Sequence, residues 1–256
     1  MTRHDTLDAH LAGLAAALLP YRREAERLSV WGNELAWTLA GGGRILVAGN
    51  GGSAAEAQHL TAELVGKLRD DREPLSAIAL HAETSALTAI GNDYGYDEVF
   101  ARQVRAHGRP DDILLLMSSS GSSRNLLTAA RAGRRTGLRC WAFTGPAPNP
   151  LADLCDDVLA VPSPDSQVVQ ELHLVSTHLL CEFVDQALPL VRQLRTVPVP
   201  PPWADPSTRR TVPFQGGSPA TATVGHRTNG HSHNGHSHSG NPHNGRGFTG
   251  TGWAAS

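Results

Sequence analysis

The chain has 256 residues and is 40% hydrophobic, enough for one α/β domain of about 190 residues with a buried core and a further segment. The formal net charge of −2 at pH 7 does not favour a nucleic-acid partner, because nucleic-acid binding usually requires a basic stripe. The sequence shows neither a signal peptide nor an apolar run long enough to span a bilayer, so we expect a cytoplasmic protein with no membrane partner.

The first 42 residues are predicted to form a helical segment that packs on the α/β domain. Between about residues 6 and 40, large apolar residues recur at helical spacing: Leu7, Leu11, Leu14, Leu18, Leu28, Trp31, Leu35 and Leu39. Pro20 is expected to interrupt this pattern, which predicts one or two helices. These helices could pack on a sheet or on another subunit.

Five short apolar runs between residues 43 and 190 predict five buried strands. They are residues 44–48, 77–80, 113–117, 139–143 and 158–161. Runs this apolar suit a parallel sheet covered on both faces. Helical patterns separate them, at residues 53–68, 85–91, 97–106, 123–136 and 166–188. This alternation predicts a three-layer α/β sandwich.

The three cysteines lie in apolar runs, far apart and without CxxC spacing, at Cys140, Cys155 and Cys181. We interpret them as reduced core residues, not as a disulfide framework. Residues 191–256 are predicted to be a Pro-rich linker and a disordered tail rich in His, Gly, Asn and Ser. Six of the 13 histidines lie in this tail, from His226 to His243. Such a tract can bind transition metals loosely, or it can be a solvated extension.

Two predicted strands are followed by loops suited to a phosphate group. The first loop, Gly49–Ser53 (GNGGS), leads into a helix whose free N–H groups can face an anion. It matches neither the dinucleotide-binding GxGxxG pattern nor the Walker A pattern. The second loop, Ser118–Ser123 (SSSGSS), has five hydroxyls around one glycine, and Ser123 could cap the next helix. Two such loops at one edge of a sheet favour a phosphate-bearing ligand over ordinary turns.

Two predicted helices carry candidate metal ligands. His59 and Glu63 share one helix face because they are four residues apart. Gln170 and His178 are eight residues apart, or about 12 Å along a helix. These four side chains are a plausible N/O ligand set for zinc, although their spacing also fits ordinary polar positions on amphipathic helices. We interpret the remaining domain histidines as structural: His81, His107 and His173.

Four segments resemble the signatures of SIS-domain phosphoheptose isomerases, in the same order. They are GNGGSAAEAQHLTAELVGK (49–67), TSALTAIGNDYGYDEVFARQV (84–104), DILLLMSSSGSSRNLL (112–127) and VVQELHLVSTHLLCE (168–182). The resemblance covers about residues 5–188. It implies a flavodoxin-like SIS fold and a homotetramer with active sites at subunit contacts.

The resemblance also implies roles for individual residues. One Zn²⁺ per subunit would be held by His59, Glu63, Gln170 and His178. The sugar phosphate would be bound by Asn50, Gly51, Gly52, Ser53, Glu63, Asn92, Asp93, Ser118, Ser119, Ser120, Ser123 and Gln170. Glu63 would act as the base and His178 as its acid/base partner in the conversion of sedoheptulose 7-phosphate to D-glycero-D-manno-heptose 7-phosphate through an enediol.

Three residues depart from the family pattern: Lys67, where arginine is expected, Arg124 in place of a small residue, and Gln167 in place of an aspartate. Two alternatives remain. A non-catalytic SIS protein could bind a replication-initiator protein, but such a protein could lack the metal residues that this chain has. An isomerase of a related ketose phosphate is the other alternative, because the sequence does not fix the length of the sugar.

Overall fold

The computed structural model describes residues 3–195 of the chain. The predicted linker and tail were placed too early at their start, because residues 191–195 belong to the last helix and Val191 is buried. The rest, with the histidines from His226 to His243, lies outside the described residues. Within the described part, apolar strands alternate with helices along the chain, as the sequence predicts.

Five parallel strands form one sheet in the order β2-β1-β3-β4-β5. This is the predicted five-stranded parallel sheet, in the flavodoxin-like order. Every residue of β1 and β3 is buried, which explains why both strands read as unbroken apolar runs. The strands span Ile45–Gly49 (β1), Ala77–Ala79 (β2), Ile113–Ser118 (β3), Arg139–Thr144 (β4) and Asp157–Ala160 (β5).

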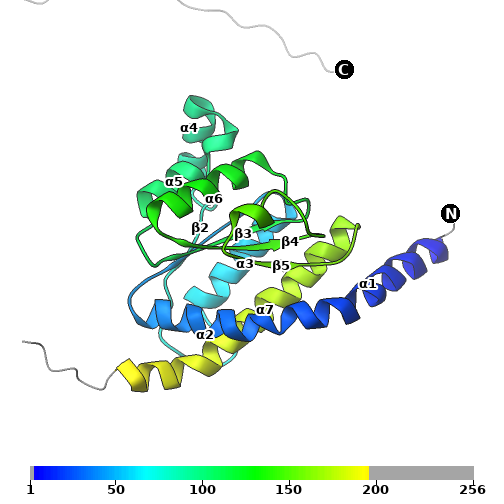
Figure 1. Cartoon of the computed structure of the whole chain (residues 1–256), viewed down its shortest axis with the longest axis horizontal. Helices are drawn as coiled ribbons and strands as arrows, with labels where there is room; N and C mark the ends of the chain where they lie inside the picture. Colours follow the sequence, from blue (N-terminus) through cyan, green and yellow to red (C-terminus); the bar gives the residue numbers. More distant parts are fainter. Residues whose placement is uncertain (1–2, 196–256) are drawn as a thin grey trace, which may run out of the picture. The chain divides into compact units, whose positions relative to one another are not determined.

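Helices cover both faces of the sheet, which completes the predicted three layers (Figure 1). One face packs against α1 (Arg3–Ala25), α2 (Arg27–Ala40), α3 (Gly52–Val65) and α7 (Ser166–Arg195). The other face packs against α5 (Ala101–His107) and α6 (Arg124–Thr136). The helix α4 (Thr84–Tyr94) buries none of its residues and projects beyond α5 and α6 in Figure 1.

The N-terminal helices differ from the prediction at Pro20. α1 continues through Pro20 to Ala25, and the break between α1 and α2 comes at Glu26. A proline costs its helix one backbone hydrogen bond. Here the following residue compensates, because Tyr21 is buried and its hydroxyl donates to the Leu172 carbonyl of α7 at 3.3 Å. The expected interruption at Pro20 was therefore wrong.

The predicted helix over residues 97–106 is divided in the structure. A 3₁₀ turn at Tyr96–Glu98 comes first, and α5 begins only at Ala101. Between them, Val99 and Phe100 are fully buried in the core beneath α5 and α6. Both neighbouring side chains are buried, and the chain is not part of a regular helix between the 3₁₀ turn and α5. Helical periodicity alone did not show this interruption.

The helix α2 is fixed to the sheet by one aromatic stack. The Trp31 ring stacks on Trp141 of β4 with 4.6 Å between centroids, and on Phe143 with 5.8 Å. Its indole N–H donates to Asp157 Oδ2 at 2.6 Å, and Arg27 donates to the other oxygen of the same carboxylate at 2.7 Å. The sequence analysis left open whether the N-terminal helices pack on the sheet or on another subunit. The structure shows α2 packed on the sheet.

The helix α7 is the one helix among the described residues that could cross a membrane by length and composition. Its apolar character has another explanation, because Leu172, Leu180, Val184 and Leu188 are buried in the core between α2, α3 and the sheet. α7 is therefore a core helix.

One buried and one largely buried titratable side chain, His173 and Glu56, lie where α3 and α7 meet β4. His173 of α7 is fully buried, and its Nε2–H donates to the Thr144 carbonyl at 3.2 Å. Its Nδ1 lies 3.8 Å from Glu56 Oε2, and both atoms are buried without a hydrogen-bond partner. Burial lowers the pKa of His173 to about 4 and raises the pKa of Glu56 to about 7. Both groups are therefore neutral in the folded protein near pH 6.

We expect Trp31→Ala to lower the free energy of unfolding by about 3–5 kcal/mol, because it removes a fully buried aromatic ring. Urea unfolding followed by circular dichroism measures this change. Trp37→Ala on the same helix is the matched control, because Trp37 is 43% exposed. Equal losses in the two variants would contradict the role assigned to the stack.

Single substitutions should also reveal two opposed pH dependences that cancel in the wild type. The pKa of Glu56 is about 7 in the folded protein against an ordinary 4.5. Its contribution to the free energy of unfolding is therefore fully present below pH 4.5 and is lost as pH rises to 7. With the folded pKa of His173 about 4 against an ordinary 6.5, stability is full above pH 6.5 and is lost as pH falls to 4.

Glu56→Gln should therefore leave a chain whose free energy of unfolding falls toward pH 4. His173→Gln should leave one whose free energy of unfolding falls toward pH 7. Each slope should approach about 1.4 kcal/mol per pH unit, measured by urea unfolding between pH 4.5 and 7. Flat profiles in both variants would refute this assignment of protons.

Candidate active site

The two predicted phosphate loops meet at one edge of the sheet. They follow β1 and β3, which are neighbours although β2 comes between them in the chain. The sheet order reverses at this pair, and open parallel sheets bind ligands in the crevice outside such a switch point. In register, Gly49 at the end of β1 pairs with Met117, one residue before the serine loop.

A reciprocal pair of amides holds the two loops together. Asn50 Nδ2 donates to Asn125 Oδ1 at 3.0 Å, and Asn125 Nδ2 donates back to Asn50 Oδ1 at 2.8 Å. The Tyr96 hydroxyl adds a third hydrogen bond to Asn50 Oδ1 at 3.2 Å. The predicted substrate residue Asn50 is thus fixed in place by two residues that the sequence analysis did not select.

The serine loop forms a compact group of hydroxyls. Ser118 Oγ lies 3.5 Å from the hydroxyl oxygens of both Ser120 and Ser123, and it accepts the Gly121 N–H at 3.1 Å. Ser123 occupies the N-cap position of α6 but makes no side-chain cap hydrogen bond. The capping role suggested for Ser123 is therefore absent, and its hydroxyl stays with the loop. Convergent hydroxyls beside a helix N-terminus can donate to a phosphate.

Glycines are required where these loops approach other parts of the chain. Gly121 has φ +62°, and a Cβ there would collide with the side chain of Asn149. A Cβ on Gly52, the first residue of α3, would collide with the amide of Gln170. Gly51, which precedes it, has φ +55°. The predicted residues Gly51, Gly52 and the buried Ser53 therefore form a tight turn into α3.

Three of the four predicted metal ligands converge between α3 and α7. The Nε2 atoms of His59 and His178 are 3.0 Å apart, and His59 Nε2 lies 3.3 Å from Glu63 Oε1. One donor atom from each side chain lies within 4.8 Å of the other two. The group faces solvent, since His178 is exposed and the His59 side chain is 41% exposed.

This donor set fits a zinc ion. Zinc takes imidazole nitrogen and carboxylate oxygen at about 2.0–2.2 Å in a tetrahedral arrangement, which places ligand atoms roughly 3.4 Å apart. The two separations in the group, 3.0 and 3.3 Å, are close to that value. Two imidazole nitrogens facing one another also leave at least one lone pair directed into the group. The side chains that are present therefore suit a divalent metal.

The fourth predicted ligand, Gln170, is not part of this group, although it lies on the same helix as His178. Gln170 is two turns before His178 on α7, and its amide packs against Gly52 at the start of α3. With Gln167 and Glu56 it lines a cavity of about 530 Å³ whose other walls are Thr6, His10, Glu171 and Leu174. His10 Nε2 lies 2.8 Å from a Glu171 oxygen at this cavity. A role for Gln170 in metal binding stays a prediction.

Asn92 and Asp93 hydrogen-bond to one another and not to either phosphate loop in the described structure. They occupy the exposed end of α4, where Asn92 donates to the Asp93 carboxylate at 2.8 Å. Within residues 3–195, neither side chain is hydrogen-bonded to one of the two phosphate loops.

Arg124, which departs from the family pattern, forms an ion pair with Asp97 at 2.9 Å and is 83% exposed. Its length is therefore accommodated by solvent.

Sequence reasoning missed Asn125, Tyr96 and Glu56. Asn125 follows the serine loop closely, and the polar side chain of Tyr96 lies within the quoted IGNDYGY stretch, so their positions beside known loops were the available signal. Glu56 lies on α3 one turn before His59, but its burial against α7 is a tertiary fact that spacing does not show.

The three cysteines are free thiols. Cys181 is buried on α7, and burial, together with the nearby Glu63 and Asp185 carboxylates, raises the pKa of its thiol to about 12. Burial likewise raises the pKa of Cys140 and of Cys155 to about 12. Thiolate is the form that binds metal, so these neutral thiols support the predicted reduced core role.

The family model that describes SIS domains matches residues 15–145. A phosphoheptose isomerase of Streptomyces coelicolor is 59% identical over 188 residues, covering 73% of this chain and 81% of the relative. One from Bradyrhizobium sp. (strain BTAi1) is 43% identical over 187 residues, covering 72% of this chain and 94% of the relative.

Two solved phosphoheptose isomerases have the same fold. The structure from Francisella tularensis has a TM-score of 0.67 at 34% identity and covers 73% of this chain and all of its own. The structure from Neisseria gonorrhoeae has a TM-score of 0.67 at 39% identity and covers 72% of this chain and all of its own. With the sheet order and both loops described above, these matches show that the chain belongs to the SIS-domain phosphoheptose isomerase family.

Proposed function

We propose that this protein is an aldose–ketose isomerase that converts sedoheptulose 7-phosphate to D-glycero-D-manno-heptose 7-phosphate. The observation that carries the proposal is the convergence of His178 on α7 with His59 and Glu63 on α3, the helix that begins at the first phosphate loop. The relatives that share this fold at 34–59% identity are phosphoheptose isomerases.

The length of α3 from the first loop to His59 is comparable to the length of an extended heptose 7-phosphate. Seven residues separate Gly52 at the cradle from His59, which corresponds to about 10 Å along the helix. An extended chain advances about 1.2 Å per bond, so the eight bonds from C1 to the phosphorus of a heptose 7-phosphate span roughly 10 Å. A phosphate held by Ser118, Ser119, Ser120 and Ser123 would place the reacting carbons near the His59–Glu63–His178 group.

Each residue then has a role in the isomerisation. The Glu63 carboxylate takes the proton from one of the two reacting carbons and returns it to the other. His178 moves the proton between the two oxygens, which the enediol requires. Asn50, Gly51, Gly52, Ser53, Asn92, Asp93 and Gln170 complete the proposed substrate contacts. Fixing the distant phosphate makes the proton transfer effectively unimolecular.

A zinc ion would be held by His59, Glu63 and His178, with Gln170 as the proposed fourth ligand. When bound, it polarises the carbonyl and stabilises negative charge on the enediolate oxygen. A single chain leaves this group exposed, and apolar side chains are exposed beside it on α7, at Leu174 and Val175. We therefore propose a cytoplasmic homotetramer in which a neighbouring chain covers the site.

Glu63→Gln should reduce kcat by about 10²–10⁴-fold, because the amide keeps the shape of the side chain but cannot accept the proton. His178→Ala should cause a similar loss. The measurement is the conversion of sedoheptulose 7-phosphate to the aldoheptose 7-phosphate, followed by NMR on zinc-loaded protein. His107→Gln is the matched control, since His107 is exposed at the end of α5.

Near-normal turnover in Glu63→Gln would remove this residue from the mechanism. No turnover in the folded wild type would shift the proposal to a related ketose phosphate, to be assayed next. A failure with those substrates too would favour the non-catalytic alternative.

Sedimentation equilibrium should report a mass of four times the 27.2 kDa chain. Leu7, Leu11 and Leu18 are exposed on one side of α1 in the single chain. A subunit contact that buried these leucines would favour association. Leu11→Glu should shift the protein toward smaller species. A clean wild-type monomer would argue against a site covered by a neighbouring chain.

A further inference from the structure

We infer that Arg72 is a positioning residue, which holds α3 and α7 at the separation that the His59–Glu63–His178 group requires. The inference rests on the proposed function, in which those three side chains bind a metal ion. Arg72 touches none of the proposed substrate-binding side chains in the described structure, so any effect on the site must pass through the backbone and through α7.

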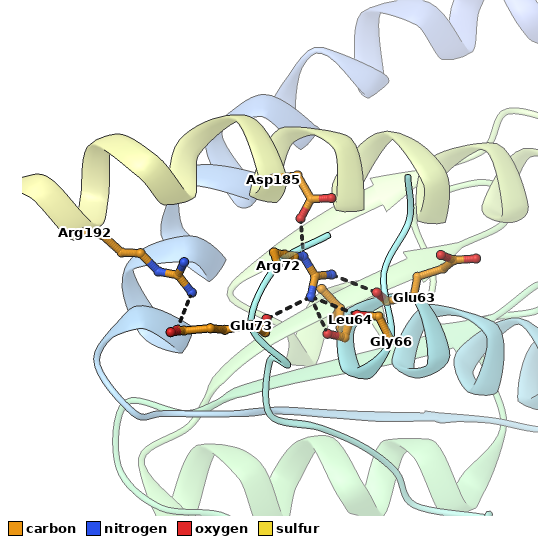
Figure 2. A network of polar contacts seen from close by, with 7 residues as sticks. All are labelled: Glu63, Leu64, Gly66, Arg72, Glu73, Asp185 and Arg192. Atoms are coloured by element: carbon orange, nitrogen blue, oxygen red, sulfur yellow. Dashed lines mark hydrogen bonds and ion pairs between the residues drawn. The ribbon is translucent and has the colours of Figure 1, made fainter. Parts of the chain in front are cut away.

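The guanidinium closes the C-terminal end of α3 (Figure 2). Its Nη2 donates to the Glu63 carbonyl at 2.8 Å, and its Nη1 donates to the Leu64 carbonyl at 2.9 Å. These carbonyls belong to the last turn of the helix, where no later helical N–H group is available to donate to them. A positive charge there also opposes the negative end of the helix dipole. Arg72 thus binds the backbone of Glu63 itself.

The same side chain reaches α7. Arg72 Nε lies 2.6 Å from Asp185 Oδ1, and the Arg72 side chain is only 9% exposed. Asp185 is seven residues after His178, which is two turns farther along the same face of α7. Figure 2 shows the guanidinium between the end of α3 and Asp185 on α7. One group therefore connects the helix of His59 and Glu63 to the helix of His178.

Arg72 also ties down the segment that leaves α3. Nη1 makes longer contacts with the Gly66 carbonyl at 3.3 Å and the Glu73 carbonyl at 3.2 Å. Lysine could not reproduce this set, because its ammonium is a compact point charge whereas the planar guanidinium distributes five donors. The site depends on sub-ångström agreement between two helices, and supporting contacts of this kind commonly change metal affinity by about 10–100-fold.

The chain offers a matched control on the same two segments. Arg69 lies 3.5 Å from Glu182, one turn before Asp185 on α7, but the Arg69 side chain is 77% exposed. Exposed ion pairs of this kind contribute little to stability. Removing Arg69 changes the same net charge in the same region without removing the contacts to the end of α3.

The experiment is a Co²⁺ titration of metal-free, full-length protein, read from the visible absorption of the bound ion. The variants are Arg72→Met, Arg72→Lys, Asp185→Asn and Arg69→Met, and circular dichroism verifies that each is folded. The His178→Ala variant measures binding by all other histidines, including those at 226–243, and that signal is subtracted.

We expect Arg72→Met to weaken Co²⁺ binding at the site by at least about tenfold and to alter the absorption spectrum. Arg72→Lys should recover only part of the affinity. Asp185→Asn leaves the helix-end contacts intact, so it tests the link to α7 even if Arg72→Met does not fold, and it should weaken binding severalfold. Arg69→Met should bind as the wild type does.

Wild-type Co²⁺ affinity and spectrum in Asp185→Asn and in folded Arg72→Met would overturn the inference while leaving the proposed function intact. An equal loss in Arg69→Met would also overturn it, because a general charge effect would then explain the result. Absence of site-specific binding in the wild type would overturn the proposed metal site and this inference with it.

Discussion

The packing of α3 against α7 on one face of the sheet is the constraint on which the site depends. α3 begins at the turn after β1, and Arg72 binds the carbonyls of its last turn. The first phosphate loop leads into this helix, which carries two of the proposed metal ligands. α7 supplies His178 from the other side. A change in the distance between these two helices would separate the Nε2 atoms of His59 and His178, which now lie 3.0 Å apart. Neither helix carries a working site alone.

The rest of the fold fixes that helix pair from outside. The Trp31 stack holds α2 on β4, and α2 in turn lies along α7 in the core. On the inner side, β1 and β3 are buried on both faces, so their hydrogen-bond register has little freedom to shift. That register sets where the β1 loop and the serine loop end, and the Asn50–Asn125 pair then joins them. Apolar packing therefore places the strands and helices of the site, and polar contacts then join its loops.

The sequence predicted those features that depend on neighbours in the chain. Five apolar runs located the strands, and the four-residue spacing placed His59 and Glu63 on one helix face. It failed where distant segments decide the outcome. Tyr21 binds α7 across 151 residues and holds α1 helical past Pro20. Asn50 and Asn125, 75 residues apart, carry no local pattern that pairs them. Arg72 reads as one charge in a polar stretch until Asp185, 113 residues later, is placed beside it.

The two pairs of polar groups on α3 and α7 show how environment separates structural from reactive roles. Glu56 with His173, and Glu63 with His178, join the same two helices with one carboxyl group and one imidazole each. The first pair is buried, and burial favours the uncharged form of both groups, so it suits packing rather than metal binding. The second pair is solvent-accessible and has His59 beside it, so an ion and a sugar can reach it. A metal ligand must be an ionised carboxylate or a neutral imidazole, and an ionised Glu56 would have to carry its charge in a site that disfavours charge. Burial, more than residue type, therefore distinguishes the pair with a packing role from the pair proposed to be reactive.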